Sequence, residues 1–494
     1  MNKLLILVLL SAAFLRFFQL GLNPPSLTWD EASWGYNAYS LGIDGKDEFG
    51  RFLPLDYLES FGDFKPPMYA YLDILPVKIF GLNEFAVRFP SALFGVLTVL
   101  LTYFLSKRIF WNSKFKIQYG LLASLIMAVS PWHIMLSRAA FEANVSTFFM
   151  VLGVFLFLQA VSRSVASFPP RRWNPVDTLG VGVWLSLSAV SFIISIYTFN
   201  TARVVAPILV LILTFAFRKE LLNRKKETAL AIILGIILIL PTLQFLLSPQ
   251  ASLRFKEVNI FSDIGPIQVS NQQISNDNNS FWSKIIHNRR LVYGVEYLKH
   301  YFDNLSPSFL FIKGDGNPKF STQNVGQMYL WDLPFFVIGV LFLFKRKEGY
   351  WWLIPLWLIL GIIPAATARE TPHALIIEVA LPTFQILIAY GFVTLINSLR
   401  RYKYPISYFF VSLLFLNVLY FLHGYFSYYA KEFSGEWQYG YKESIGYVTA
   451  VQDKFDQINI TEELGRPYIY YLFYMKRDPQ EFRKSAIIER EALG

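Results

Sequence analysis

The feature that most constrains this chain is a series of long apolar stretches bounded by polar or charged residues. A helix that crosses a bilayer needs about 20 mostly apolar residues, and eleven stretches approach this length. Of all residues, 54% are hydrophobic and 16% are charged, whereas soluble proteins carry about 25% charged residues. The sequence therefore predicts an all-α polytopic membrane protein. The predicted spans are residues 4–21, 86–106, 117–136, 141–162, 178–197, 203–217, 228–247, 331–344, 350–366, 373–396 and 405–422.

The short connections between the spans predict the orientation. Lys and Arg precede the first span and follow every even-numbered one, so with eleven spans they all lie on one side. An excess of basic residues in short loops marks the cytoplasmic side. We therefore expect a plasma (inner) membrane protein with a cytoplasmic N-terminus and an extracytoplasmic C-terminus. The basic residues are Lys3, Lys107, Arg108, Lys114, Lys116, Arg163, Arg171, Arg172, Arg218, Lys219, Arg224, Lys225, Lys226, Lys345, Arg346, Lys347, Arg400, Arg401 and Lys403.

This distribution accounts for the net charge of +10 without a nucleic-acid partner. The chain also contains no cysteine, which excludes disulfides, thiolate nucleophiles and Cys-ligated metals.

The longest polar segments all fall on the predicted outer side. We expect a transmembrane domain over residues 1–422, with a catalytic outer loop at 22–85 and a second outer loop at 248–330. Residues 423–494 should form a small extracytoplasmic α/β region, whose role the sequence does not reveal. Within it the pattern predicts a helix near 441–455, a strand near 457–460 and a second helix near 467–474.

The first outer loop carries two adjacent carboxylates, Asp30 and Glu31, at the start of an amphipathic stretch over residues 32–41. Thr28 and Glu31 have the spacing of a capping box, in which each side chain bonds the other residue's backbone N–H. The position also suits chemistry, because the positive end of a helix keeps a carboxylate ionised and able to accept a proton. Both interpretations hold if Glu31 caps the helix while Asp30 points into a cavity.

Lys65 lies further along the same loop, before Pro66 and Pro67, which hold it outside a helix. An ammonium held in this way can pair with a phosphate. An ordinary lysine that extends from the membrane interface toward water is an equal alternative. Arg88 begins the second span, where an arginine is typical of an interface anchor.

Further polar residues mark the outer ends of later spans. Arg138 and Glu142, between the third and fourth spans, are four apart and would share one helix face. This spacing fits a simple ion pair within a helix, but charged groups at membrane depth also mark substrate paths. Residues 197–203 and 369–373 add polar groups at two more span ends. We expect all of them to converge with the first-loop residues on the outer face.

Taken in order, these motifs resemble those of a known family. Asp-Glu in the first outer loop is followed by Lys-Pro-Pro with Tyr69, and then by Arg-x-Pro-Ser at the second span. Ser-Pro-Trp-His, Ser-Arg and Glu follow in the turn after the third span. This order resembles the GT-C glycosyltransferases of family 39, which include protein O-mannosyltransferases and lipid A aminoarabinose transferases, in their bacterial branch. The resemblance covers residues 1–205 best and continues through 326–331 and 364–382.

The resemblance implies that a sugar, a hexose or a pentose, passes with inversion from a polyprenyl-phosphate carrier to an acceptor on the outer side. The acceptor could be a protein, a lipid or a cell-envelope glycan. The resemblance implies that Asp30 is the catalytic base with Glu31 beside it, and that Lys65 binds the carrier phosphate. It adds Glu142 to the catalytic residues. The further substrate-binding residues that it implies are Arg138, Tyr69, Arg88 and His373.

Two departures from the family pattern concern metal and phosphate. The Glu that precedes the lysine in aminoarabinose transferases is Phe64 here, which leaves open whether a divalent metal takes part. The Pro-His-Ala-Leu stretch, often followed by Arg in bacterial relatives, continues with Ile376, so phosphate contacts from that segment also stay open. No resident cofactor is predicted, because the lipid-linked sugar is the substrate.

Two other functions are compatible with such a chain. A transporter or lipid flippase would need ionisable residues near the bilayer midplane and repeated halves, whereas the candidates here lie at outer span ends. A glycan polymerase or ligase that uses polyprenyl-diphosphate donors would share the topology and the basic outer face. The number of phosphates on the donor would distinguish it.

Overall fold

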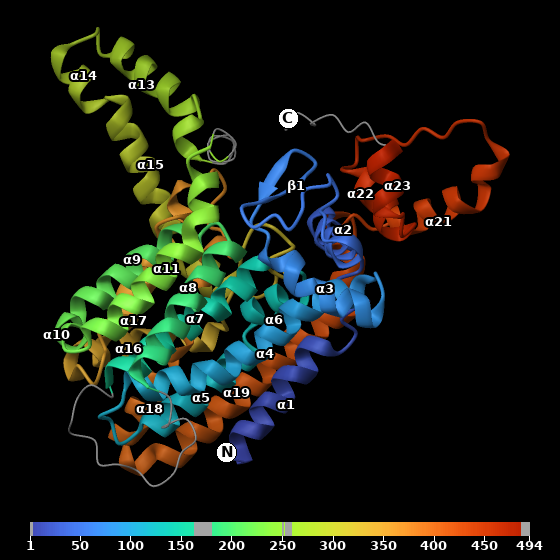
Figure 1. Ribbon diagram of the computed structural model, residues 1–494. Helices are drawn as coiled ribbons and strands as arrows, with labels where there is room; N and C mark the ends of the chain where they lie inside the picture. Colours follow the sequence, from blue (N-terminus) through green and yellow to red (C-terminus); the bar gives the residue numbers. More distant parts are fainter. Residues whose placement is uncertain (1–2, 163–179, 249–250, 252–258, 486–494) are drawn as a thin grey trace.

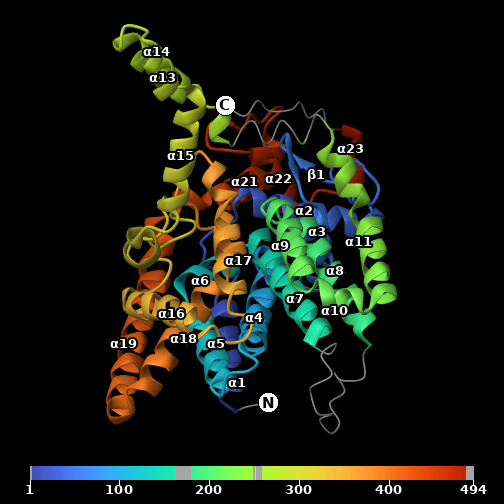
Figure 2. The ribbon, with the colours of Figure 1, turned by 90° about the vertical axis from the view of Figure 1, so that its left-hand side faces the viewer.

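The structure, a computed structural model, describes residues 3–162, 180–248, 251 and 259–485. Figure 1 shows a bundle of helices with one small hairpin of strands. The N-terminal end lies at one end of the bundle, and the first loop and the C-terminal helices gather at the other (Figures 1 and 2). Arg163, Arg171 and Arg172, which the sequence places in an inner loop, lie outside the described residues.

Each predicted span contains a helix. Within the described residues, five helices are long and apolar enough to cross a membrane, and a sixth span results if the bent pair α5–α6 counts as one. Shorter apolar helices include α9, α17 and α18, so the number eleven stays a prediction. The helices are α1 (Lys3–Phe17), α4 (Glu84–Ile109), α5 (Lys116–Val129), α6 (Pro131–Arg138), α7 (Glu142–Ser162), α8 (Val181–Thr198), α9 (Ala202–Ala216), α11 (Lys225–Leu246), α16 (Leu333–Arg346), α17 (Leu353–Ile362), α18 (Thr383–Ser398) and α19 (Lys403–Gly424).

The third predicted span is broken twice near its outer end. Helices α5 and α6 meet at Pro131 with a bend of 56°, because proline cannot donate the backbone hydrogen bond that would continue α5. Helix α6 ends at Arg138, and Ala139 is extended with φ −108° and ψ 162°. Glu142 then begins α7. The prediction that Arg138 and Glu142 share a helix face is therefore wrong, since they belong to two helices.

Small residues allow a close contact between α16 and α18. A Cβ on Gly339 of α16 would lie 2.1 Å from the carbonyl oxygen of Leu387 in α18, and one on Gly391 of α18 would lie 2.0 Å from that of Phe335. Glycine at both positions lets the two backbones touch, as is common between membrane helices. Helices α11 and α19 lie at the periphery, where most of their apolar side chains are exposed.

The first outer loop folds as a helix, a hairpin and a second helix. These are α2 (Trp29–Asp44), β1 (Leu58–Ser60) paired antiparallel with β2 (Asp63–Lys65), and α3 (Met68–Phe80). The predicted capping box at the start of α2 is confirmed, with both hydrogen bonds between Thr28 and Glu31 present. Helix α2 ends at Gly45, whose φ of 74° favours glycine.

The C-terminal region packs on the first outer loop. Its helices are α21 (Tyr441–Val451), α22 (Pro467–Tyr474) and α23 (Pro479–Ser485), which confirms the two predicted helices. Helix α22 approaches α2 at Gly35, where a Cβ would lie 2.6 Å from Cε2 of Phe473. The strand predicted near 457–460 is wrong, because the structure assigns none there and a strand depends on a pairing partner. The described part of this region is helical rather than α/β.

The second outer loop contains helices that project from the bundle (Figures 1 and 2). They are α13 (Gly265–Asn276), α14 (Phe281–Ile286) and α15 (Arg289–Asp303), and a turn at 277–280 separates the first two. The remaining short elements are α10 (Arg218–Leu222), η2 (Ile260–Ser262), η3 (Ser308–Ile312), η4 (Leu330–Asp332), η5 (Ala365–Thr367), η6 (Ile376–Ala380), η7 (Arg400–Tyr402), η8 (Tyr425–Tyr429), α20 (Ala430–Glu432), η9 (Gly435–Trp437) and η10 (Gln452–Lys454).

Candidate active site

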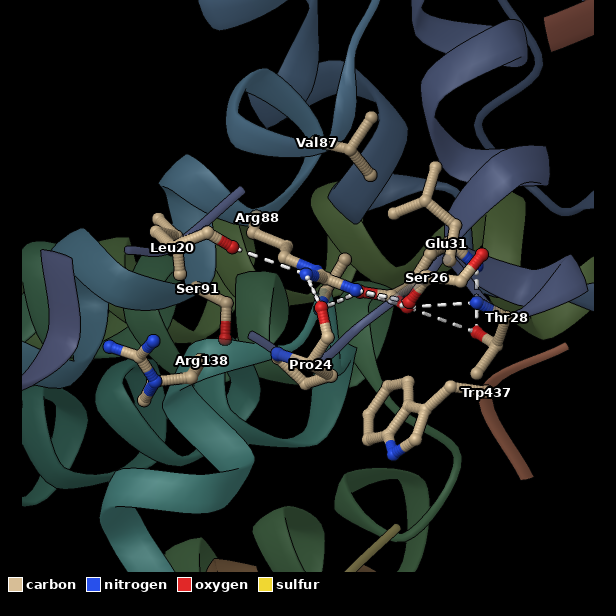
Figure 3. A network of polar contacts seen from close by, with 12 residues as sticks. Leu20, Pro24, Ser26, Thr28, Glu31, Val87, Arg88, Ser91, Arg138 and Trp437 are labelled. Carbon is tan, nitrogen blue, oxygen red and sulfur yellow. Dashed lines mark hydrogen bonds and ion pairs between the residues drawn. The ribbon is translucent and has the colours of Figure 1, made fainter. Parts of the chain in front are cut away.

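Glu31 forms a buried ion pair with Arg88 (Figure 3). The Nε of Arg88 lies 2.9 Å from Oε1 of Glu31, and the other N–H groups donate to the second carboxylate oxygen and to loop carbonyls. Glu31 also accepts from the backbone N–H groups of Thr28 and Ala140. The side chain of Arg88 is 0% exposed and that of Glu31 is 1% exposed. In this conformation they brace the first loop and neither reaches a substrate.

Arg138 is fully buried and donates from every nitrogen of its guanidinium. Most of its acceptors are carbonyls at the end of α1 and just beyond, so the side chain satisfies a helix end that has no further N–H partners. The resemblance implies that Arg138 binds a phosphate, but in this structure all the N–H groups of its guanidinium are already used. The acceptors are the carbonyl oxygens of Leu15, Arg16, Gln19 and Asn23 and the hydroxyl of Tyr425.

Asp30, at the start of α2, and Lys65, at the end of β2, form an ion pair. The ammonium of Lys65 also lies 4.2 Å from the ring centre of Phe61 and 5.3 Å from that of Trp34. Lys65 is 8% exposed, whereas Asp30 is 47% exposed. The lysine is thus held in an aromatic setting, where a cation is attracted to the ring faces, and the carboxylate stays open to solvent.

Three carboxylates lie in the neighbourhood of Lys65, and Asp30, Asp63 and Glu142 are called the acidic cluster below. As the first residue of α7, Glu142 interacts electrostatically with Asp30, Lys65 and Asp63. Glu378 in η6 lies behind it, fully buried, and interacts electrostatically with Glu142. The structure therefore brings two of the predicted catalytic residues, Asp30 and Glu142, to one lysine.

Tyr69 and His373 do not join this cluster through any hydrogen bond in the described part of the chain. The hydroxyl of Tyr69 donates to the carbonyl of Val87 at 2.8 Å, and the side chain is fully buried. The imidazole of His373 packs 5.1 Å from the ring of Phe320. Tyr69 supports the wall of the site, and His373 belongs to the neighbouring outer segment.

Sequence reasoning missed Glu48, which joins the C-terminal region to the first loop. Tyr468 of α22 donates to its carboxylate at 3.2 Å, and Asn37 both donates to that carboxylate and accepts from the Glu48 N–H. Burial raises the pKa of Glu48 to about 8. Further contacts to the tail run from Arg483 to Asp44 and from Lys442 to Glu84. No local signal could have revealed contacts between residues about 400 positions apart.

A metal centre built by the protein needs several ligand side chains close together. Within the described residues no group of three or more His, Asp or Glu side chains has a geometry that could hold a metal ion. The acidic cluster instead surrounds an ammonium, which already neutralises one of its carboxylates.

The fold of this class of membrane helix bundle is similar to that of two solved structures. ArnT from Cupriavidus metallidurans matches with a TM-score of 0.52 and 14% identity, over 98% of this chain and 87% of that one. The archaeal oligosaccharyltransferase AglB from Archaeoglobus fulgidus matches with a TM-score of 0.52 and 13% identity. That match covers 93% of this chain and 60% of the AglB chain. At this identity the likeness concerns the fold alone.

The sequence identifies the family within this class. The profile of the dolichyl-phosphate-mannose-protein mannosyltransferase family matches residues 6–256, about half of the chain, and the chain belongs to this family. An uncharacterised protein of Aquifex aeolicus is 34% identical over 165 residues, and the provisionally named mannosyltransferase YkcB of Bacillus subtilis is 27% identical over 166. Each match covers 33% of this chain, and they span 31% and 21% of those two relatives.

Proposed function

We propose that this protein is an inverting glycosyltransferase that moves a sugar from a polyprenyl-phosphate carrier to an acceptor on the outer side of the membrane. The observation that carries the proposal is the pair of Asp30 and Lys65, in which the carboxylate is half-exposed and the ammonium is enclosed. The family to which the chain belongs supports a lipid-linked donor. The solved structures of similar fold include ArnT bound to undecaprenyl phosphate and AglB with a dolichol-phosphate.

The proposed reaction is a single displacement at the anomeric carbon. The acceptor hydroxyl oxygen forms a bond to that carbon while the bond from the carbon to the phosphate oxygen breaks. Asp30 takes the hydroxyl proton as a general base, and the carrier phosphate leaves with an added negative charge, which Lys65 stabilises. Before the donor binds, Lys65 and Asp30 neutralise each other. The donor phosphate then pairs with the ammonium of Lys65 in place of Asp30, and the Asp30 carboxylate becomes available to accept a proton.

The other predicted site residues take different roles in this proposal. Glu142 faces the same lysine from α7 and positions the acceptor or the donor sugar. Glu31, Arg88 and Arg138 act as structural groups, because their polar atoms are satisfied by the protein and their side chains are buried. Tyr69 is likewise structural.

The proposal includes the topology expected from the sequence. Residues 1–422 form the transmembrane domain with eleven spans and a cytoplasmic N-terminus, and the loops 22–85 and 248–330 lie outside. Residues 423–494 form an extracytoplasmic region that braces the catalytic loop. The docking of α22 on α2 supports this arrangement.

The test is a transfer assay with purified protein in lipid and a panel of labelled polyprenyl-monophosphate sugars, with a membrane fraction as the acceptor source. Release of the free carrier phosphate is followed for the native chain, Asp30→Asn and the matched control Asp56→Asn. Asp56 belongs to the same loop but pairs with Arg51 on the surface. We expect release by the native chain and the control, and little by Asp30→Asn. Release only from diphosphate donors, or release that survives Asp30→Asn, would contradict the proposal.

A further inference from the structure

Arg203 is a basic residue that the proposed mechanism does not use. It lies in the first turn of α9, and its guanidinium carbon is 5.4 Å from the ring centre of Phe245. Its Nε and Nη2 atoms are buried, and among the described residues neither has a hydrogen-bond acceptor. A guanidinium stays charged in proteins and has five donors. Buried donors without partners are costly, so the chemistry of this position favours an anion.

Arg203 differs from Arg88 and Arg138, and it has fewer partners than Arg16, in which only Nε lacks an acceptor. Arg88 and Arg138 use every nitrogen on backbone carbonyls, a carboxylate or a hydroxyl. Arg203 is only partly buried as a residue. Its Nη1 atom, unlike Nε and Nη2, is not among the buried unpartnered atoms, so an anion can approach the guanidinium at Nη1. Its planar fork suits a phosphate, which accepts two parallel N–H groups.

Arg203 lies on the other side of the hairpin that carries Lys65. The ring of Phe245 is 4.9 Å from that of Tyr57 and 6.5 Å from that of Phe64. Phe64 and Lys65 are successive residues of β2, and successive side chains of a strand point to opposite faces. The two cations therefore flank one thin element of the first loop.

The side of the hairpin that Arg203 occupies adjoins the apolar surface of the bundle. Helix α9 exposes Val204, Leu211 and Phe215, and α11 exposes a longer apolar row. In a bilayer these faces lie against lipid chains. An anion that reaches Arg203 along them must itself carry an apolar tail. The exposed row on α11 comprises Ile232, Ile233, Ile236, Ile237, Leu240 and Leu243.

We propose that Arg203 binds the phosphate of the polyprenyl carrier, at a subsite on the lipid-facing side of the hairpin that carries Lys65. This inference rests on the proposed function, because it takes the donor to be a lipid phosphate. The linked sugar-phosphate is a diester with one negative charge, whereas the free carrier is a monoester with about 1.5 to 2 charges at pH 7. Arg203 should therefore hold the released carrier more tightly than the donor.

The experiment measures equilibrium binding of sugar-free polyprenyl monophosphate to the whole protein in lipid nanodiscs, together with donor kinetics. The variants are Arg203→Gln, Arg203→Lys and the matched control Arg218→Gln. Arg218 begins α10, just after α9, and bonds a backbone carbonyl. Polyprenol of the same length tests the tail alone. Inorganic phosphate and phosphatidate-containing nanodiscs test phosphate from other sources.

We expect Arg203→Gln to weaken binding of the carrier about tenfold or more, as for a lost charge-assisted hydrogen bond, and to raise the donor KM by a smaller factor while kcat is retained. Arg203→Lys should recover part of the affinity, and Arg218→Gln should match the native chain. Binding of polyprenol should not depend on Arg203.

Unchanged carrier binding in Arg203→Gln, alongside a transfer activity that still needs Asp30, would overturn this inference and leave the proposed function standing. If binding of phosphatidate or of inorganic phosphate weakens in Arg203→Gln as much as binding of the carrier does, the assignment of the site to the carrier is overturned. If the native chain neither binds the carrier nor uses a monophosphate donor, the proposed function fails and the inference fails with it. A variant that loses the native thermal transition is replaced by Arg203→Lys for the same comparison.

Discussion

Two groups of charged residues at the end of the bundle that holds the first loop differ in how completely the protein itself satisfies them. Arg88 and Arg138 are buried, and their N–H groups go to Glu31, to backbone carbonyls and to Tyr425. The acidic cluster around Lys65 has one ion pair, and its Asp30 is about half exposed. The sequence presents both groups in similar short motifs, but the second has a carboxylate, that of Asp30, which a substrate can reach from solvent.

The comparison teaches where charge serves the fold and where it serves chemistry. A helix end inside a membrane protein leaves carbonyls that water cannot reach. The Arg138 guanidinium satisfies those at the end of α1 and thereby ties α6 to α1. The Arg88 guanidinium does the same for the first loop. These two arginines hold the loop in place so that Asp30 and Lys65 can meet at its surface.

The largest effect that we expect comes from Asp30→Asn. Because general-base catalysis contributes about 10²- to 10⁴-fold, transfer should fall by that factor. The thermal stability in lipid should change little, because a half-exposed ion pair contributes about 0 to 1 kcal/mol. The paired measurement is the transfer rate and the unfolding temperature of the same preparation. A large loss of stability in Asp30→Asn would show that Asp30 supports the fold, as Arg88 and Arg138 do.

Arg88→Gln should have the opposite profile. Removing one partner of a buried ion pair costs about 3–5 kcal/mol, because Glu31 would be left charged and buried without its partner. We expect a large fall in the unfolding temperature, with transfer lost only in proportion to the folded fraction. The double variant Arg88→Met with Glu31→Met should recover part of the loss, since it leaves no unpaired charge. A stable Arg88→Gln variant without transfer would instead place Arg88 in the active site.

The burial of the Glu48 carboxyl should make stability depend on pH. The pKa of Glu48 is raised to about 8 in the folded protein, whereas the unfolded chain has the ordinary value near 4.3. Its favourable contribution is thus full below the ordinary value and is lost as the pH rises toward 8. We expect the unfolding temperature of the native chain to fall more steeply from pH 5 to pH 8 than that of Glu48→Gln. Identical slopes would show that Glu48 titrates normally, and Asp56→Asn serves as the control.

The smallest effect should come from Lys442→Gln, which breaks the surface pair with Glu84 at 2.8 Å. The lysine is 58% exposed, so we expect a loss below about 1 kcal/mol that shrinks further in high salt. A double-mutant cycle with Glu84→Gln measures the interaction itself. A coupling energy as large as that at Arg88 would mean that the tail is held by ion pairs rather than by the packing of α22 on α2.

Much of the fold follows from local sequence patterns. The apolar stretches predicted where helices form, and the Thr28 to Glu31 spacing predicted the cap of α2, because both depend on residues a few positions apart. The breaks at Pro131 and Ala139 moved Arg138 and Glu142 into separate helices. Spacing alone could not reveal the second break, since alanine is a good helix former.

The sequence by itself determined the apolar helices, the family and the motif order that marks the first loop as the place to look for chemistry. The tertiary structure decided which charges are free. Glu31 and Asp30 are adjacent in the chain, but one is enclosed by Arg88 and backbone N–H groups and the other faces solvent. The physical reason is that burial and hydrogen bonding depend on partners distant in sequence, such as Ala140 for Glu31 and Phe245 for Arg203.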